Sequence, residues 1–313
     1  MSTASRPGHL HEAGFYRSDA EFRALIVPFV EEGLAAGQPV IIGYDDRKAS
    51  LLRSWVSNEA AVTFIADNAL YATPAKAIAS YWKMFEQHIA AGATRIRIAG
   101  DVPHEGNGGR FAGWDCYESA INTVWDQFPV LSRCLYDATT AAPHVLDIAG
   151  RTHPRIALPS GQVQHNVRYQ HPADFQPLPS EPDPLERTPL ALEVTDPSAA
   201  QIRRAVTSIG HGHVSAPILI DLQIGASEAV SNAWRHGRPP VTVRIWATDG
   251  RVVVRVHDTG PGPADPLAGL TPAWANPEFE HSGLWLIGTL DLDTALIRSG
   301  DGFTVRLAAG RAA

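Results

Sequence analysis

The first half of the chain alternates short apolar runs with amphipathic stretches. Runs of strand length occur at residues 39–44, 61–65, 94–101 and 132–138. Apolar residues at helical spacing fill the gaps between them, over residues 75–91 and 110–127. Strands separated by helices predict a parallel sheet with helices on its faces. We therefore expect an α/β domain over residues 8–171.

A proline-rich stretch interrupts this pattern between residues 172 and 189. The prolines that remove backbone donors there are Pro172, Pro177, Pro179, Pro182, Pro184 and Pro189. The pattern predicts an extended, semi-rigid linker without regular structure.

The pattern after the linker is that of an α+β domain over residues 190–310. Residues 190–194 form a strand pattern, and a helix is expected to follow with Asp196 as its N-cap and Pro197 at its first position. A second, longer helix covers residues 222–237. Apolar and polar residues then alternate on both sides of turns in residues 241–258 and 294–307, which predicts two antiparallel hairpins.

Composition narrows the class of protein. The chain has 313 residues, of which 44% are hydrophobic and 19% charged, with a formal net charge of −7. A general nucleic-acid binder is disfavoured because such proteins need a basic field. Two cysteines provide no disulfide framework, and no apolar stretch is long enough to form a signal core or to cross a membrane. We expect a reduced, cytoplasmic protein with no membrane segment.

Candidate chemistry lies in the second half. Glu228, Asn232 and His236 are spaced by four on the predicted helix, so they share one side of it. A D-x-G-x-G motif follows a strand, and a glycine opens a helix in HSGLWLIG (residues 281–288). Glycines let a ligand approach the backbone, and an asparagine oxygen suits Mg²⁺. His236 is expected to bond to carbonyls at the helix end.

These motifs resemble the GHKL (Bergerat) ATPase fold. The segments SEAVSNAWRHG and GFTVRL resemble those of the anti-sigma factor serine kinases in particular. The resemblance implies that the chain binds ATP and Mg²⁺ and phosphorylates a serine or threonine of a partner, with Glu228 as general base. The resemblance also implies the cofactor-binding residues. Asn232 would hold Mg²⁺, and Asp258 would bind the adenine amine. Gly260 and Gly262 would border the nucleotide, and Gly283 and Leu284 would cap its phosphates.

Two departures from the family pattern leave alternatives open. His281 stands where a glycine is usual, and residues 263–280 form a short, proline-bearing lid. The implied partners are a sigma factor, its antagonist, or both. One alternative is a non-catalytic module that sequesters such a partner. Another is an orphan histidine-kinase-like regulator, although no histidine phosphorylation motif is visible. A homodimer remains open.

The first half resembles the MEDS sensory domain, through GHLHEAGFYRSDAEF, RIRIAGDV and SRCLYDA. Its layout also resembles a P-loop ATPase, but YRSDAEF replaces the G-x-x-x-x-G-K-[ST] loop, so no phosphate cradle is expected. We expect this domain to sense a small molecule or to dock a partner. The candidate residues near the predicted strand ends are Tyr16, Arg97, Asp101 and Trp114.

Two histidine pairs are a further candidate for metal binding. His9 and His11 flank one residue, as do His211 and His213. No neighbouring cysteine or histidine completes a ligand set for either pair. The sequence therefore offers only Asn232 as a metal ligand.

Overall fold

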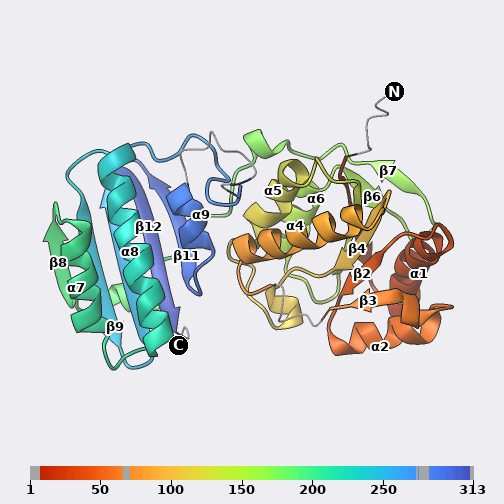
Figure 1. The fold of residues 1–313 in the computed structure, drawn as a ribbon, viewed down its shortest axis with the longest axis horizontal. Coiled ribbons are helices and arrows are strands. Elements are labelled where there is room, and N and C mark those ends of the chain that lie inside the picture. The colour runs from red at the N-terminus through yellow and green to blue at the C-terminus, as the bar shows by residue number, and fades with distance from the viewer. Residues whose placement is uncertain (1–7, 66–70, 273, 275–281, 311–313) are drawn as a thin grey trace. The chain divides into compact units, whose positions relative to one another are not determined.

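The computed structural model describes residues 8–65, 71–272, 274 and 282–310 (Figure 1). The chain divides into two compact units, one of Met1–Ala72 with Lys76–Gln176 and one of Thr73–Ala75 with Pro177–Ala313. None of the helices in the described ranges combines the length and the hydropathy that crossing a lipid bilayer requires.

The first unit is built on a seven-stranded sheet with the order β3-β2-β4-β5-β1-β6-β7. Its strands are β1 (Leu10–Tyr16), β2 (Val40–Gly43), β3 (Val62–Phe64), β4 (Ile96–Gly100), β5 (Val130–Asp137), β6 (Arg155–Ala157) and β7 (Val163–His165). The expectation of a parallel sheet holds from β3 to β6. It is wrong for β7, which returns antiparallel to β6 through a short turn and makes the sheet mixed.

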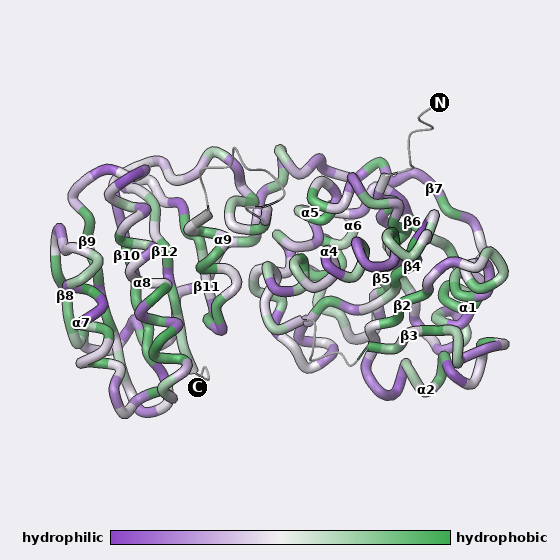
Figure 2. The backbone as a smooth tube through the Cα atoms, viewed as in Figure 1, coloured by the Kyte–Doolittle hydropathy of each residue, from purple (hydrophilic) through white to green (hydrophobic). Residues whose placement is uncertain are grey.

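Helices cover both faces of this sheet. The helices are α1 (Asp19–Ala35), α2 (Asp46–Trp55), α4 (Pro74–Ala90), α5 (Trp114–Val124) and α6 (Pro143–Thr152). Short 3₁₀ turns lie at Glu59–Ala61, Glu105–Asn107 and Pro172–Asp174. Strands β2 and β4 are buried along their whole length, and β2 is hydrophobic up to its final glycine (Figure 2). This burial is typical of parallel strands covered on both faces.

The second unit is a five-stranded antiparallel sheet with helices on one face (Figure 1). The order is β11-β12-β10-β9-β8, from β8 (Leu192–Thr195), β9 (Thr242–Thr248), β10 (Arg251–Asp258), β11 (Asp293–Ser299) and β12 (Gly302–Gly310). Both predicted hairpins are confirmed, as β9–β10 and β11–β12. The helices are α7 (Ala199–Gly210), α8 (Ala216–His236) and α9 (Ser282–Gly288).

The start of α7 differs from the prediction. Ser198, not Asp196, is the N-cap, and its hydroxyl accepts from the Gln201 N–H at 3.3 Å. Asp196 has a φ of 53°, and its Oδ1 accepts from the Val241 N–H at 2.8 Å. The carboxylate therefore ties the strand-to-helix turn to the start of β9.

The proline-rich stretch also differs from the prediction. It contains two 3₁₀ turns, the one at Pro172–Asp174 and one at Pro184–Arg187. The second turn packs on the face of the second unit's sheet that carries no helix. Leu185 is buried there with Trp246, Val253 and Ala308.

Candidate functional site

Helix α8 carries the predicted polar side chains beside its buried face. Its apolar residues join the core of the second unit, through Leu222, Ala226, Ala229, Val230 and Ala233. Gly225 lets the helix approach the sheet, since a Cβ there would lie 3.0 Å from Leu307 Cδ1. Glu228 and Asn232 are half-buried, and His236 is exposed in the last turn. The helix thus holds Glu228 and Asn232 at the boundary between core and solvent.

Asn232 lies against the start of α9. A Cβ on Gly283 would be 2.8 Å from Asn232 Nδ2 and 2.9 Å from its Oδ1, so a side chain at residue 283 would displace the carboxamide. Within the described ranges, Asn232 Nδ2 is buried and has no hydrogen-bond partner. Buried polar groups are nearly always paired, so an unpaired amide is typical of a position that meets a ligand.

Asp258 ends β10 and is held from two directions. Its Oδ1 accepts from the backbone N–H of Gly260 at 2.7 Å and of Arg238 at 3.1 Å. A Cβ on Gly260 would lie 2.7 Å from that oxygen, and one on Gly237 would lie 2.3 Å from it. The carboxylate is 4% exposed. These two bonds fix its orientation and leave Oδ2 as a further acceptor for an amine.

The remaining predicted residues can offer only their backbone to a ligand. Gly262 has a φ of 71°, and a Cβ there would lie 2.5 Å from the ring of Phe303. The side chain of Leu284 is buried in the core, so only its backbone is available to a ligand. Gly269, with a φ of 90°, packs against the Leu284 carbonyl.

The structure brings most of the predicted site together around the C-terminal half of α8. Asn232 meets Gly283, and Asp258 meets Gly260 next to the end of the helix. The sequence had not identified Gly237 and Arg238, which position Asp258. The signal for them was a glycine directly after the helix. His281 and part of the predicted lid, residues 273 and 275–280, lie outside the described residues.

The candidates in the first unit separate into different environments. The Lys48 ammonium donates a hydrogen bond to Asp101. Burial raises the pKa of nearby Tyr16 to about 12; the charge of Lys48 opposes this shift, and the charge of Asp101 adds to it. Lys48 was not identified from the sequence. Arg97 instead donates to the Phe29 carbonyl at 2.8 Å, and Trp114 is buried. Only Tyr16 and Asp101 therefore belong to one cluster, the ion pair with Lys48.

Two family models match the chain, one to each unit. Residues 10–154 match the MEDS model, described as the methanogen/methylotroph, DcmR sensory domain. Residues 192–309 match the histidine kinase-like ATPase domain. The chain joins a MEDS domain to a histidine kinase-like ATPase domain. No curated protein matches the chain.

Solved structures from two organisms are similar to parts of the chain. The histidine kinase domain of the Erythrobacter litoralis EL346 blue-light activated histidine kinase is 19% identical, with a TM-score of 0.24, over 36% of this chain and 58% of that one. The RsbU and RsbW domains of Rv1364c from Mycobacterium tuberculosis are 21% identical, with a TM-score of 0.24, over 39% of this chain and 32% of that one. The chain thus spans less than two thirds of the length of these structures.

Proposed function

We propose that the ATPase domain binds ATP with Mg²⁺ and phosphorylates a serine or threonine hydroxyl of a partner protein. The partner is an antagonist of a sigma factor in the cytoplasm, so the chain acts as an anti-sigma regulatory factor. The MEDS domain controls this activity by sensing a small molecule. The observation that carries the proposal is the amide of Asn232 against Gly283, whose buried Nδ2 finds no hydrogen-bond partner among the described residues.

The Asn232 carboxamide suits the magnesium–triphosphate end of a nucleotide. Its oxygen is a hard ligand of the kind that Mg²⁺ prefers, and its buried Nδ2 is a donor suited to a phosphate oxygen. Bound Mg²⁺ bridges the β- and γ-phosphates and neutralises the charge that develops during transfer. The backbone of Gly283 and Leu284 would face the phosphates, where a side chain at residue 283 would displace Asn232.

Asp258 suits the other end of the nucleotide. The exocyclic amine of adenine is a hydrogen-bond donor, and Asp258 Oδ2 is an acceptor that the bonds from Gly260 and Arg238 leave unused. Gly260 and Gly262 would border the base, because backbone without side chains allows close approach. The carboxylate would therefore select an amino-purine over a base with a carbonyl at that position.

Glu228 is the residue we assign to proton transfer. It lies one turn before Asn232 on the same side of α8 and is half-buried. A carboxylate beside the phosphoryl group can accept the proton of an attacking hydroxyl, while the rest of the site supplies position and charge. This role is distinct from nucleotide binding, so the two can be separated by mutation.

Calorimetry on the full chain tests nucleotide binding. Asn232→Ala should abolish magnesium-dependent ATP binding, while Ser231→Ala, its neighbour on another side of the helix, should preserve it. Equal ATP affinity of the Asn232 variant and the wild type would refute the site.

Phosphorylation of candidate antagonist proteins tests the chemistry. Glu228→Gln should reduce the rate about 10²–10⁴-fold, the usual contribution of a general base, with ATP affinity little changed. A wild-type chain that binds Mg–ATP but phosphorylates none of the antagonists would support the alternative of a binding module.

We infer that the MEDS domain is a P-loop-like scaffold that has lost its phosphate cradle. Strand β1 and helix α1 are joined only by Arg17 and Ser18, and the Ser18 hydroxyl caps the helix by accepting from the Glu21 N–H. A connection of two residues is too short to wrap a phosphate as a glycine-rich loop does. This supports a sensory role for the domain in place of nucleotide hydrolysis.

A further inference from the structure

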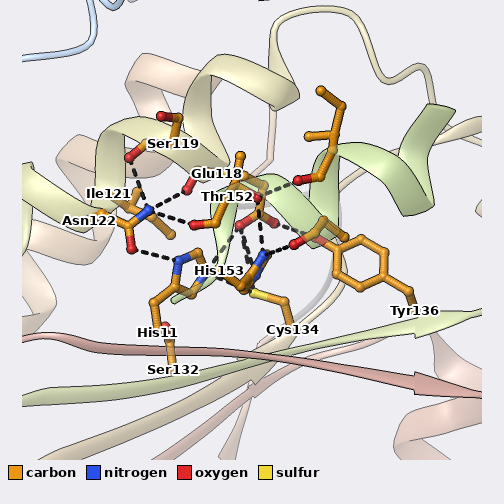
Figure 3. A network of polar contacts seen from close by, with 12 residues as sticks. His11, Glu118, Ser119, Ile121, Asn122, Ser132, Cys134, Tyr136, Thr152 and His153 are labelled. Atoms are coloured by element: carbon orange, nitrogen blue, oxygen red, sulfur yellow. Dashed lines mark hydrogen bonds and ion pairs between the residues drawn. The ribbon is translucent and has the colours of Figure 1, made fainter. Parts of the chain in front are cut away.

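Four side chains that can bind a metal meet inside the MEDS domain (Figure 3). They are His11 of β1, Glu118 of α5, Cys134 of β5 and His153, which follows α6. Their nitrogen, oxygen and sulfur atoms all lie within 4.8 Å of one another. Parallel pairing places Ala13 beside Cys134, so His11, two residues earlier, points to the same side of the sheet as the cysteine.

Four of the six distances between these atoms are close to the separations of ligands around one ion. Glu118 Oε2 lies 3.1 Å from His11 Nε2 and 3.4 Å from His153 Nε2. Cys134 Sγ lies 3.6 Å from His11 Nε2 and 3.9 Å from Glu118 Oε2. Tetrahedral zinc, with bonds of about 2.0–2.1 Å to nitrogen and oxygen and about 2.3 Å to sulfur, holds N and O ligands about 3.4 Å apart and sulfur about 3.6 Å from them.

Hydrogen bonds on the outer side of His11 fix which ring nitrogen carries its proton. Asn122 Nδ2 lies within 3.1 Å of the carbonyl oxygens of Glu118, Ser119 and Thr152, so it is the donating end of the amide. Asn122 Oδ1 must then accept from His11 Nδ1, at 3.1 Å. The Nε2 lone pair of His11 is consequently left pointing into the centre of the cluster.

His153 is arranged in the same way. Its Nδ1 lies 2.9 Å from the Ala149 carbonyl, which can only accept, so the proton is on Nδ1. Both rings are fully buried, which disfavours their charged, doubly protonated form. His153 Nε2 is buried and, among the residues described, has no hydrogen-bond partner. Two imidazole lone pairs therefore face one carboxylate oxygen in a fully buried space.

We propose that His11, Glu118, Cys134 and His153 bind a divalent transition-metal ion, with Zn²⁺ the best match to the ligand set. Two imidazole nitrogens, one thiolate and one carboxylate form a tetrahedral set of the kind zinc takes, and the two anions balance its charge. Binding displaces the proton of the Cys134 thiol and any proton on the Glu118 carboxyl, which leave to solvent.

Hydrogen bonds from neighbouring residues hold three of the four proposed ligands in place. Asn122 and the Ala149 carbonyl orient the imidazoles, and the Tyr136 hydroxyl donates to Glu118 Oε1 at 2.8 Å. Hydrogen bonds of this kind, to the outer atoms of ligands, are typical of metal sites. The ion would join two strands and the helical layer above them, so it would contribute directly to the stability of the MEDS domain.

Metal analysis of the untagged full chain, followed by cobalt substitution, tests the proposal. We expect about one equivalent of zinc per chain after dialysis against Zn²⁺, and a thiolate-to-cobalt charge-transfer band with tetrahedral d–d bands in the Co²⁺ form. The chain has 2 cysteines, so the charge-transfer band reports on one of them. Cys134→Ser should remove the band, and Cys116→Ser should keep it.

Two further variants compare a residue that supports a metal ligand with a residue that only packs beside one. Tyr136→Phe removes only the hydroxyl that holds Glu118 and should weaken zinc binding about 10–100-fold. His9→Asn removes a partly buried ring that stacks on His11 at 5.2 Å and whose nitrogens bond to the Ile121 carbonyl and to Ser132. This variant should leave the metal content unchanged. The proposal is overturned if the folded wild type retains no metal and gives no charge-transfer band, or if Cys134→Ser gives the same band as the wild type.

Discussion

Among single residues, two glycines share a left-handed backbone conformation but differ in the space around them. Comparing alanine substitutions at the two positions separates the cost of backbone strain from the cost of side-chain crowding. Gly262 (φ 71°) faces the Phe303 ring, whereas nothing described lies within 4 Å of a Cβ on Gly250 (φ 77°). Alanine in this left-handed region costs about 1–2 kcal/mol at either position, and overpacking adds about 1–3 kcal/mol at Gly262. Gly262→Ala should therefore lower the denaturation midpoint of the ATPase domain clearly more than Gly250→Ala. Equal shifts would contradict the crowding.

The part of the candidate site that lies on one helix could be predicted from the spacing of its residues in the sequence. The stripe of Glu228 and Asn232 follows from helical periodicity, which needs no knowledge of the rest of the fold. The anchoring of Asp258 by the Arg238 N–H depends on where α8 ends relative to β10, and these residues are 20 positions apart. Lys48 escaped prediction for the same reason, because its partner Asp101 is 53 positions away.

Among the elements, the segment before β8 behaves as part of the ATPase domain. Asp183 receives hydrogen bonds from the Arg251 guanidinium, and both side chains are nearly fully buried. Glu186 accepts from Arg255 at 2.7 Å and from Arg306 at 3.4 Å. Prolines indicated an irregular segment, but they could not indicate that its carboxylates pair with arginines of the sheet.

The Asp183–Arg251 pair gives a prediction about stability. Asp183→Ala removes the closest carboxylate partner of the buried Arg251, which then keeps Asp293 at 3.9 Å and the Gly310 carbonyl. This loss should destabilise the ATPase domain by up to about 3–5 kcal/mol. Glu193→Ala is the matched control, because it breaks the exposed Glu193–Arg244 pair, whose contribution should be about 0–1 kcal/mol. Chemical denaturation of the two variants measures the difference, and a similar small effect of both would show that the segment is not docked in solution.

The same pair predicts an acid response. Burial raises the pKa of Asp183, but hydrogen bonds from Arg251 and from the Leu185 N–H lower it more, so the net pKa is below its usual range. Its contribution to stability is present above the unfolded pKa of about 3.9 and is lost as the pH falls through the lower, folded value. The difference in stability between wild type and Asp183→Asn should therefore shrink below about pH 4. A difference that stays constant down to pH 2 would exclude this ionisation as its source.

For the whole molecule, the sequence indicated two domains but not what the first one encloses. The hairpins and the alternation of strands and helices are local patterns, and both were predicted. His11 and Cys134 are 123 positions apart, and only the parallel pairing of β1 with β5 brings them together. The sequence offered His9 with His11 as a pair and no completing ligand, because the completing ligands come from other elements.

Joining a MEDS domain to an ATPase domain leads to a prediction about coupling. If the MEDS domain controls the ATPase domain, ATP affinity should differ between the full chain and the ATPase domain alone. Coupling between sites is typically about 1–3 kcal/mol, or roughly 5–150-fold in affinity. The isolated domain should begin at Pro177, because a start beyond Asp183 would remove the closest carboxylate partner of Arg251.

Calorimetry with Mg–ATP on the full chain and on residues 177–313 measures this coupling, with the full chain both loaded with zinc and stripped of it. A several-fold difference in affinity between the full chain and the fragment supports control by the MEDS domain. A difference in ATP affinity between the zinc-loaded and the zinc-free full chain would show that metal binding at the buried cluster is coupled to ATP binding. Such coupling is reciprocal, because each ligand changes the affinity for the other by the same factor. Equal affinities in all three samples, with and without cell extract to supply a sensed molecule, would leave the MEDS domain as a localisation or dimerisation module.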